Sequence, residues 1–363
     1  MNKRKTIDFT IFFYVFVFFI ISIITLYSTL NYLSISNLVL KQVLFYILGI
    51  FIIFFVVKIG NERLLKYSFY IYLINLVLLL VVLIFGNEIN GTKAWIEIPL
   101  FGSLQPSEFM KIGLILFLAQ IITKERKKGS SDFVIILKSV LVFLIPTILT
   151  FLEPDTGAVF VYFIITLVIL FTSGIKLRWF VVGFSIILVI ILIFSYFYFF
   201  KQNLFIEVLG SDFFYRFDRI IDWSNSSGMQ LENSIIGISS SNLFGHGFNN
   251  IPIYFPELQT DFIFASYVSC FGLFGAILLI IFLILFDNKI LSIAKRSKKE
   301  QNKLILLGIF ASLLYQQVQN IAMTIGLLPI TGITLPFISY GGSSLLSFLI
   351  LIGIVINIAI EKE

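Results

Sequence analysis

Charged residues, cysteine and histidine are all scarce in this sequence, and each scarcity excludes a class of protein. Only 13% of the 363 residues are charged, whereas a soluble domain usually carries about 25%. The single cysteine, Cys270, rules out an internal disulfide framework and a cysteine metal cluster. His246 is the only histidine, so the sequence gives little support to a Ser-His-Asp triad or to a histidine metal site.

Hydrophobic residues are abundant instead. They make up 59% of the chain, and phenylalanine alone occurs 43 times. One aqueous core of this size cannot hide so much apolar surface, so most of it must face lipid. The sequence predicts an all-α polytopic membrane protein with ten transmembrane helices of about 20 residues in one membrane domain, 1–363. The ten apolar runs lie near 8–28, 40–58, 66–86, 107–123, 133–152, 156–174, 179–200, 262–287, 303–325 and 341–360.

The basic residues lie in short clusters between these apolar runs. The net charge of +6 does not indicate nucleic acid, because the basic side chains do not share one soluble face. With the N-terminus inside, most of the 26 basic residues fall in inner segments, which predicts that both termini are cytoplasmic. Lys3-Arg4-Lys5 and the run after it resemble a signal peptide. That run is long and lacks a small-x-small cleavage pattern, so we interpret it as an uncleaved first helix.

Three segments predicted on the outer side have a different character. They are a short one near 87–106, a large acidic one near 201–261 and an uncharged one near 326–340. Proline and glycine in the third segment preclude a regular helix. Non-helical backbone at membrane depth is tolerated where it lines a cavity or is buried in protein. We therefore expect the functional site among these outer segments.

The run Gln105–Lys111 opens the fourth predicted span. Pro106 or Ser107 suits a helix start, and Glu108 and Lys111 are three residues apart, so they share a helix face. A capped helix start with an ion pair explains this pattern. Equally, paired charges at a membrane entrance would contact a polar substrate, because charges within spans usually face a cavity or a bundle interior.

The run Glu153-Pro154-Asp155-Thr156-Gly157 predicts a tight turn between the fifth and sixth spans. Ordinary turn chemistry accounts for Asp155 better than catalysis does. Two carboxylates this close also suit a divalent cation, although their spacing alone does not specify one.

Arg216, Arg219 and Asp222 recur every three residues among aromatic residues in the large outer segment. This spacing predicts a short amphipathic helix in the outer membrane interface. One interpretation is a plain interfacial anchor. The alternative is that Arg216 or Arg219 holds a phosphate, which a guanidinium group binds bidentately.

The run Phe255–Ala265 places carboxylates at the threshold of the eighth predicted span. Thr260 or Asp261 would cap the start of that helix by accepting hydrogen bonds from its free backbone amides. A carboxylate at this position could also act as a general base that takes a proton from an attacking hydroxyl. The two roles are compatible, and the residues alone favour capping.

At these clusters the sequence closely resembles the SEDS family (shape, elongation, division and sporulation), whose members include RodA, FtsW and SpoVE. The matches occur in order over nearly the whole chain. They are Asn90-Gly91 with Trp95, Gln105–Lys111, Glu153–Gly157, Phe244-Gly245 with Gly247, Pro256-Glu257, Thr260–Ala265 and Gly326–Ser344.

The resemblance implies a ten-helix fold and peptidoglycan glycosyltransferase activity in the bacterial cytoplasmic membrane. Such proteins polymerise lipid II, release undecaprenyl pyrophosphate and usually act with a class B penicillin-binding protein, which crosslinks the strands. The essential aspartate of the family's Thr-Asp-Phe motif falls on Asp261. It would accept the proton of an acceptor 4-hydroxyl that attacks the anomeric carbon with inversion, by analogy with inverting sugar hydrolysis.

The leaving pyrophosphate needs positive charge from basic residues or from a divalent cation such as Mg²⁺ or Mn²⁺. Lys111, Arg216 and Arg219 are the candidate basic residues. The matching motifs also imply substrate-binding roles for Glu108, Glu257, Thr260 and Ser343.

This sequence departs from the family where two consecutive acidic residues are common, because Ser269 and Cys270 stand there. The stretch 98–102 and the turn at 153–157 are slightly closer to the RodA, or elongation, branch. Two other functions stay open: a transporter of lipid II or another amphiphile, and a non-catalytic scaffold for a transpeptidase. The transporter is disfavoured because acidic groups crowd the outer side and no inverted repeat is apparent.

Overall fold

The computed structural model describes residues 9–33, 37–89, 92–98, 102–210 and 228–361. Within them, nine helices are long and apolar enough to cross a membrane, and a tenth, α7, is apolar with 17 residues. All ten predicted spans are therefore present as helices, and the predicted all-α fold class is confirmed. They are α1 (Phe9–Thr29), α2 (Leu38–Ile59), α4 (Ser68–Phe85), α5 (Pro106–Lys127), α6 (Asp132–Leu152), α7 (Thr156–Thr172), α8 (Leu177–Phe200), α12 (Ile263–Arg296), α13 (Glu300–Thr324) and α14 (Gly342–Ile360).

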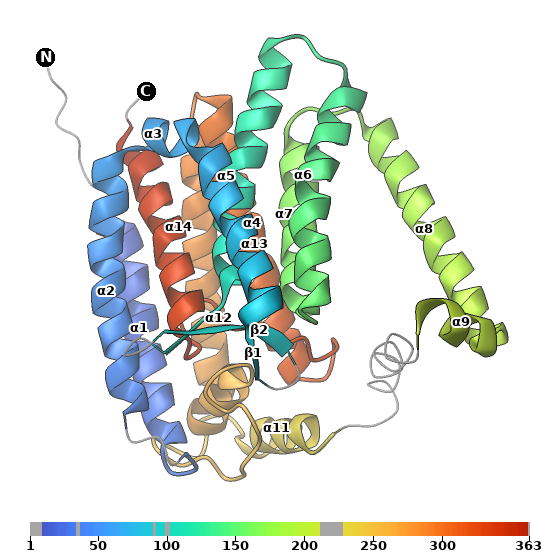
Figure 1. Cartoon of the computed structure of the whole chain (residues 1–363). Coiled ribbons are helices and arrows are strands. Elements are labelled where there is room, and N and C mark those ends of the chain that lie inside the picture. Colours follow the sequence, from blue (N-terminus) through green and yellow to red (C-terminus); the bar gives the residue numbers. More distant parts are fainter. Residues whose placement is uncertain (1–8, 34–36, 90–91, 99–101, 211–227, 362–363) are drawn as a thin grey trace, which may run out of the picture.

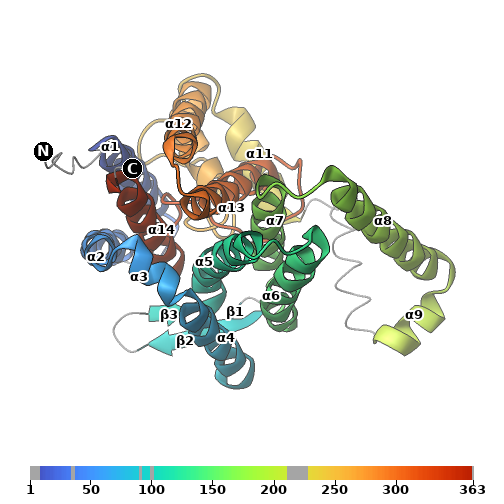
Figure 2. The same cartoon turned by 90° about the horizontal axis from the view of Figure 1, so that it is seen from above.

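Three helices form the centre of the bundle. In the most apolar stretch of each, 72% of the residues of α5, 67% of α13 and 83% of α14 are buried. Helices α5 and α13 are also the least hydropathic spans, because protein rather than lipid surrounds them and their polar residues can pair. By contrast, none of that stretch of α8 is buried, and α8 stands apart from the bundle in both views (Figures 1 and 2).

The bundle has two distinct ends (Figure 1). Helix α1 begins and α14 ends at one end, where the short helix α3 (Asn61–Lys66) also lies; we call this end the terminal face. The opposite end, the loop face, carries a small sheet and helix α11 (Met229–Ser240). Helix α9 (Gln202–Leu209) follows α8.

A three-stranded antiparallel sheet lies at the loop face, where the sequence led us to expect only a loop. Its strands are β1 (Asn87–Ile89), β2 (Thr92–Ile98) and β3 (Gly102–Leu104), in the order β1-β2-β3. Asn87 pairs with Trp95, and Ile96 pairs with Leu104. Strand β3 leads into α5 through Gln105, so the sheet fixes where α5 begins.

The segment before α12 has a small apolar core of its own. The predicted large outer segment contains α9 and α11, and the part that holds Arg216 and Arg219 lies outside the described residues. Apolar side chains of α11 pack on the chain that leads to α12, which holds that segment in place. The buried members of this core are Leu231, Ile251, Phe255, Leu258, Phe262, Ala265 and Cys270.

Candidate active site

Asp261 lies at the loop face, half-buried, and only Phe262 separates it from the start of α12. Its backbone carbonyl accepts a hydrogen bond of 2.8 Å from the Asn320 side chain of α13, which also donates to the carbonyl of Ile333 at 2.7 Å. Asn320 thus ties Asp261 to the non-helical segment 325–341. Within the described chain the Asp261 carboxylate makes no hydrogen bond or ion pair, so its oxygens are available to an external ligand.

The predicted capping of α12 by Thr260 or Asp261 is wrong. The helix begins at Ile263 with Phe262 in the capping position, and no side chain caps it. The chain turns before the helix instead: the amides of Thr260 and Phe262 both donate to the carbonyl of Glu257, which has a positive φ of 59°. This turn leaves the Asp261 carboxylate unused by the backbone.

The segment 325–341 packs over this turn. Ser339 donates its hydroxyl to the Thr260 carbonyl at 2.6 Å, and the Tyr340 amide donates to the Gln259 carbonyl at 2.8 Å. The Thr260 hydroxyl donates to the Glu257 carboxylate at 2.5 Å. Non-helical backbone therefore lines the site here, as its proline and glycine content predicts.

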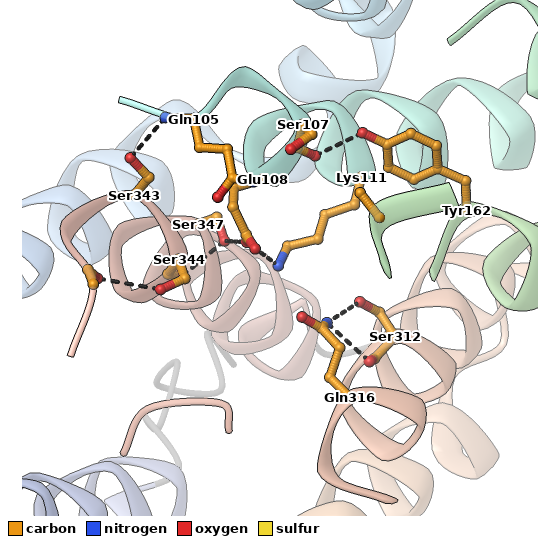
Figure 3. Close-up of polar contacts among 12 residues, drawn as sticks. Gln105, Ser107, Glu108, Lys111, Tyr162, Ser312, Gln316, Ser343, Ser344 and Ser347 are labelled. Carbon is orange, nitrogen blue, oxygen red and sulfur yellow. Dashed lines mark hydrogen bonds and ion pairs between the residues drawn. The ribbon is translucent and has the colours of Figure 1, made fainter. Parts of the chain in front are cut away.

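Asp155 connects two helices at the loop face. One of its carboxylate oxygens accepts hydrogen bonds from the Gln105 side chain at 2.9 Å and the Ser107 hydroxyl at 2.8 Å. The other accepts from the Ala158 amide at 3.0 Å, so Asp155 caps α7. The predicted turn is confirmed, but the cross-link to α5 is a contact that the sequence did not reveal. Tyr162 strengthens it by donating to the Ser107 carbonyl at 2.8 Å (Figure 3).

The predicted ion pair of Glu108 and Lys111 is confirmed in the first turns of α5. The Lys111 ammonium lies 2.5 Å from the Glu108 carboxylate and 3.9 Å from the centre of the Phe348 ring on α14. Ser347 of α14 donates to the same carboxylate at 3.1 Å (Figure 3). The lysine side chain is only 3% exposed, so carboxylate, hydroxyl and aromatic ring replace water around the pair.

Ser343 joins the sheet, α5 and α14. Its hydroxyl donates to the Ser103 carbonyl of β3 at 3.1 Å. It accepts from the Gln105 backbone amide at 3.0 Å (Figure 3). These two contacts hold the start of α5 against the start of α14. A role for Ser343 in substrate binding stays a prediction.

Burial and neighbouring negative charge shift the acidity of the site. Burial, followed by the charges of Glu257 and Asp155, raises the pKa of Asp261 to about 7. A carboxylate of this kind exchanges its proton near neutral pH, where a general base works best. The site thus has two parts: the contacts of Asp155 that join α5 to α7, and the Asp261 turn before α12. Because the charge of Asp155 contributes to the pKa of Asp261, the two parts interact electrostatically.

The described residues contain no group of three or more histidine, cysteine, aspartate or glutamate side chains placed to hold a metal ion. The divalent cation stays a prediction. Among the candidates from the sequence, Glu108 and Lys111 lie on α5, and Glu257 and Thr260 lie in the Asp261 turn.

The departure at Ser269 and Cys270 lies within α12. Both side chains are buried, and their carbonyls accept the amides of His246 and Gly247 at 2.9 and 3.0 Å. The pair thus anchors the 244–247 loop to α12. The His246 ring lies in this loop, 3.0 Å from the Ser240 hydroxyl.

Comparison with known proteins gives matches over nearly the whole chain. The family model FTSW_RODA_SPOVE, described as cell cycle protein, matches residues 5–363. A probable peptidoglycan glycosyltransferase FtsW of Wigglesworthia glossinidia brevipalpis is 35% identical over 334 residues, covering 87% of this chain and 82% of the relative. Its namesake in Coxiella burnetii is 35% identical over 311 residues, covering 82% and 79%.

Two solved structures share the fold. A chain of a peptidoglycan synthase complex that coordinates polymerization and crosslinking superposes with a TM-score of 0.81 at 25% identity, covering 98% of both chains. The rod shape determining protein RodA of Thermus thermophilus gives a TM-score of 0.72 at 25% identity, covering 98% of this chain and 97% of RodA. The similarity therefore reaches both the FtsW and the RodA branches, and the slight preference for RodA stays a prediction.

Proposed function

Because this chain belongs to the FtsW, RodA and SpoVE family, we propose that it is a peptidoglycan glycosyltransferase that polymerises lipid II in the bacterial cytoplasmic membrane. The observation that carries the proposal is Asp261: a half-buried carboxylate that has no partner among the described residues and is held at the loop face of a membrane bundle. Both termini lie on the cytoplasmic side in this proposal, so the loop face is extracytoplasmic. The lysines gathered at the terminal face support that orientation.

Asp261 acts as the general base. It accepts the proton from the 4-hydroxyl of the acceptor sugar, whose oxygen attacks the anomeric carbon of the lipid-linked donor while the pyrophosphate leaves. A pKa of about 7 suits this task, because a substantial fraction of Asp261 is deprotonated at neutral pH and still basic enough to accept the proton. One displacement of this kind inverts the anomeric configuration.

Positive charge must stabilise the leaving pyrophosphate. Lys111 is one source, but its pairing with Glu108 reduces the charge that it offers. We therefore propose that Arg216 and Arg219 of the large outer segment, or a divalent cation, carry most of this task.

An apolar cavity of 310 Å³ supports a lipid-linked substrate. It lies between α2, α4, α5 and α14, and Leu104 and Phe109, which flank the start of α5, form part of its wall. A hydrocarbon chain in this cavity would run next to the Glu108 turn. The carrier lipid could thus stay in the membrane while its sugar meets Asp261.

The partner in this proposal is a class B penicillin-binding protein. Its support is the similarity to a chain of a peptidoglycan synthase complex. The transporter and the scaffold are the competing functions, and all three make different predictions for a reconstituted system.

The test uses the purified full chain, with its partner, and labelled lipid II. Asp261→Asn keeps the size of the side chain but removes the base, so we expect polymer formation to fall by roughly 100-fold or more. Glu232→Gln is the matched control, because Glu232 is an exposed carboxylate on α11 at the same face, and it should polymerise normally.

Each competing function gives a distinct result in this assay. Undiminished polymer from Asp261→Asn would remove the catalytic assignment. Movement of lipid II across vesicles without polymer, in the wild type, would favour the transporter. Polymer that depends only on the partner would favour the scaffold.

A further inference from the structure

A second cavity, of 470 Å³, lies at the terminal face, at the opposite end of the bundle from Asp261, and unlike the first it is lined mostly by polar and charged residues. It is bordered by α3, the last turns of α5, the start of α13 and the end of α14, which adjoin one another at this face (Figure 2). Nothing in the proposed polymerase reaction uses this cavity. Its charged lining residues are Glu62, Lys66, Lys124, Lys127, Lys299 and Glu361.

The cavity has an excess of positive charge. Lys299 lies 3.3 Å from the Glu62 carboxylate and 3.5 Å from the Glu361 carboxylate, so both acidic groups are directed to this one lysine. The other three lysines, Lys66, Lys124 and Lys127, make no ion pair with an acidic side chain in the described part of the chain. Three ammonium groups around one cavity attract an anion with several acceptor oxygens, such as a phosphate.

The hydrogen bonds of Asn61 give a second, independent indication of what the cavity binds. It lines the cavity, is 1% exposed and donates its amide hydrogen to the Asn302 side-chain oxygen at 2.6 Å. Asn302 in turn donates to the Glu361 carboxylate at 2.9 Å. Because a carboxylate only accepts, this chain of hydrogen bonds fixes both amide orientations.

The side-chain oxygen of Asn61 is consequently left without a donor among the described residues. Buried acceptors are normally satisfied, so an unpartnered one beside a cavity calls for a donor on a ligand. A hydroxyl group is such a donor. The lysines therefore favour a phosphate group on the ligand, and Asn61 favours a hydroxyl group on the same ligand.

We propose that this cavity binds a phosphate ester that carries a free hydroxyl. Lys66, Lys124 and Lys127 hold the phosphate, and the hydroxyl donates to Asn61. Such an ester has two sources: the head group of an anionic phospholipid, since the cavity lies at the ends of spanning helices, or a soluble polyol phosphate. The cavity has the size of a small-molecule site.

The test measures thermal unfolding of the purified full chain in detergent against four probes: phosphatidylglycerol, phosphatidylmethanol, phosphatidylcholine and glycerol 3-phosphate. Phosphatidylmethanol has the charge of phosphatidylglycerol but no head-group hydroxyl. We expect a saturable rise in melting temperature with phosphatidylglycerol, about tenfold weaker binding of phosphatidylmethanol, and no saturable rise with phosphatidylcholine. An equal rise with glycerol 3-phosphate identifies a soluble ester as the source, and a rise confined to the lipid identifies the head group.

Charge variants locate the site. Lys124→Gln with Lys127→Gln should weaken binding by about tenfold or more, and Lys124→Arg with Lys127→Arg should restore it, which separates lost binding from misfolding. Lys295→Gln with Arg296→Gln is the matched control, because it removes the same charge from exposed positions at the end of α12 outside the cavity. Equal loss in the control pair, equal binding of phosphatidylmethanol, or no saturable rise with either ester would overturn the proposal.

Discussion

Glu153, at the end of α6, is a fully buried carboxylate. Neither of its oxygens has a hydrogen-bond partner within the described chain. Burial, followed by the charge of Asp155, raises the pKa of Glu153 from 4.5 to about 8. A carboxyl group with a raised pKa stabilises the fold below its unfolded pKa, and that contribution is lost as the pH rises through its folded pKa.

Glu153→Gln removes this titration and keeps the shape of the side chain. We expect the wild type to lose thermal stability relative to the variant as the pH rises from about 5 to about 8, so the difference in melting temperature grows with pH. Unfolding in detergent across this range measures it. Glu97→Gln, at an exposed position of β2, should follow the wild type, and a pH-independent difference for Glu153→Gln would contradict the account.

At the scale of elements, the non-helical segment 325–341 sets the geometry around Asp261. Gly332 lies in this segment with a φ of +70°, and a Cβ atom there would be 3.6 Å from an Asp261 carboxylate oxygen. The backbone is held near the carboxylate by Asn320, which reaches Ile333 from α13. The segment thus controls both the position and the surroundings of the proposed base.

Gly332→Ala tests this control. Because of the positive φ, alanine at this position should lower the stability of the fold by about 1 kcal/mol or more. Its methyl group would also occupy the space beside the Asp261 carboxylate. Gly174→Ala, in the turn between α7 and α8, has a φ of +80° and open space around the added carbon, so it carries only the backbone cost. We expect similar stability losses, with polymerisation reduced roughly tenfold for Gly332→Ala alone; equal activities of the two variants would refute the role of the segment.

At the scale of the whole molecule, the spans were predictable because each depends on a long run of apolar residues, and lipid exposure enforces that pattern. The sheet at the loop face was missed because two of its strands have only three residues, which is too short to show an alternating pattern. The apolar run of α8 predicted a span correctly, but a run of residues says nothing about whether a helix packs against its neighbours.

The site was predictable only in part. Asp261 was already a candidate base from its place before the eighth predicted span, and the resemblance favoured that role over capping. Its predicted capping role was wrong because helix starts are uncertain by one or two residues. Asp155 looked like a turn residue, since its contact with Ser107 joins positions 48 apart in the chain. Asn320 joins α13 to the Asp261 turn, and sequence spacing cannot show which backbone carbonyl a side-chain amide will reach.

The central claim is that the Asp261 carboxylate is the base, and the pH dependence of polymerisation tests it most directly. We expect activity to fall as the pH decreases through about 7, where Asp261 becomes protonated. Glu257→Gln removes a negative charge that raises this pKa, so the fall should move to lower pH, whereas Glu232→Gln should leave it unchanged. An acidic limb that stays in place in Glu257→Gln, or no acidic limb near pH 7 in the wild type, would contradict the account.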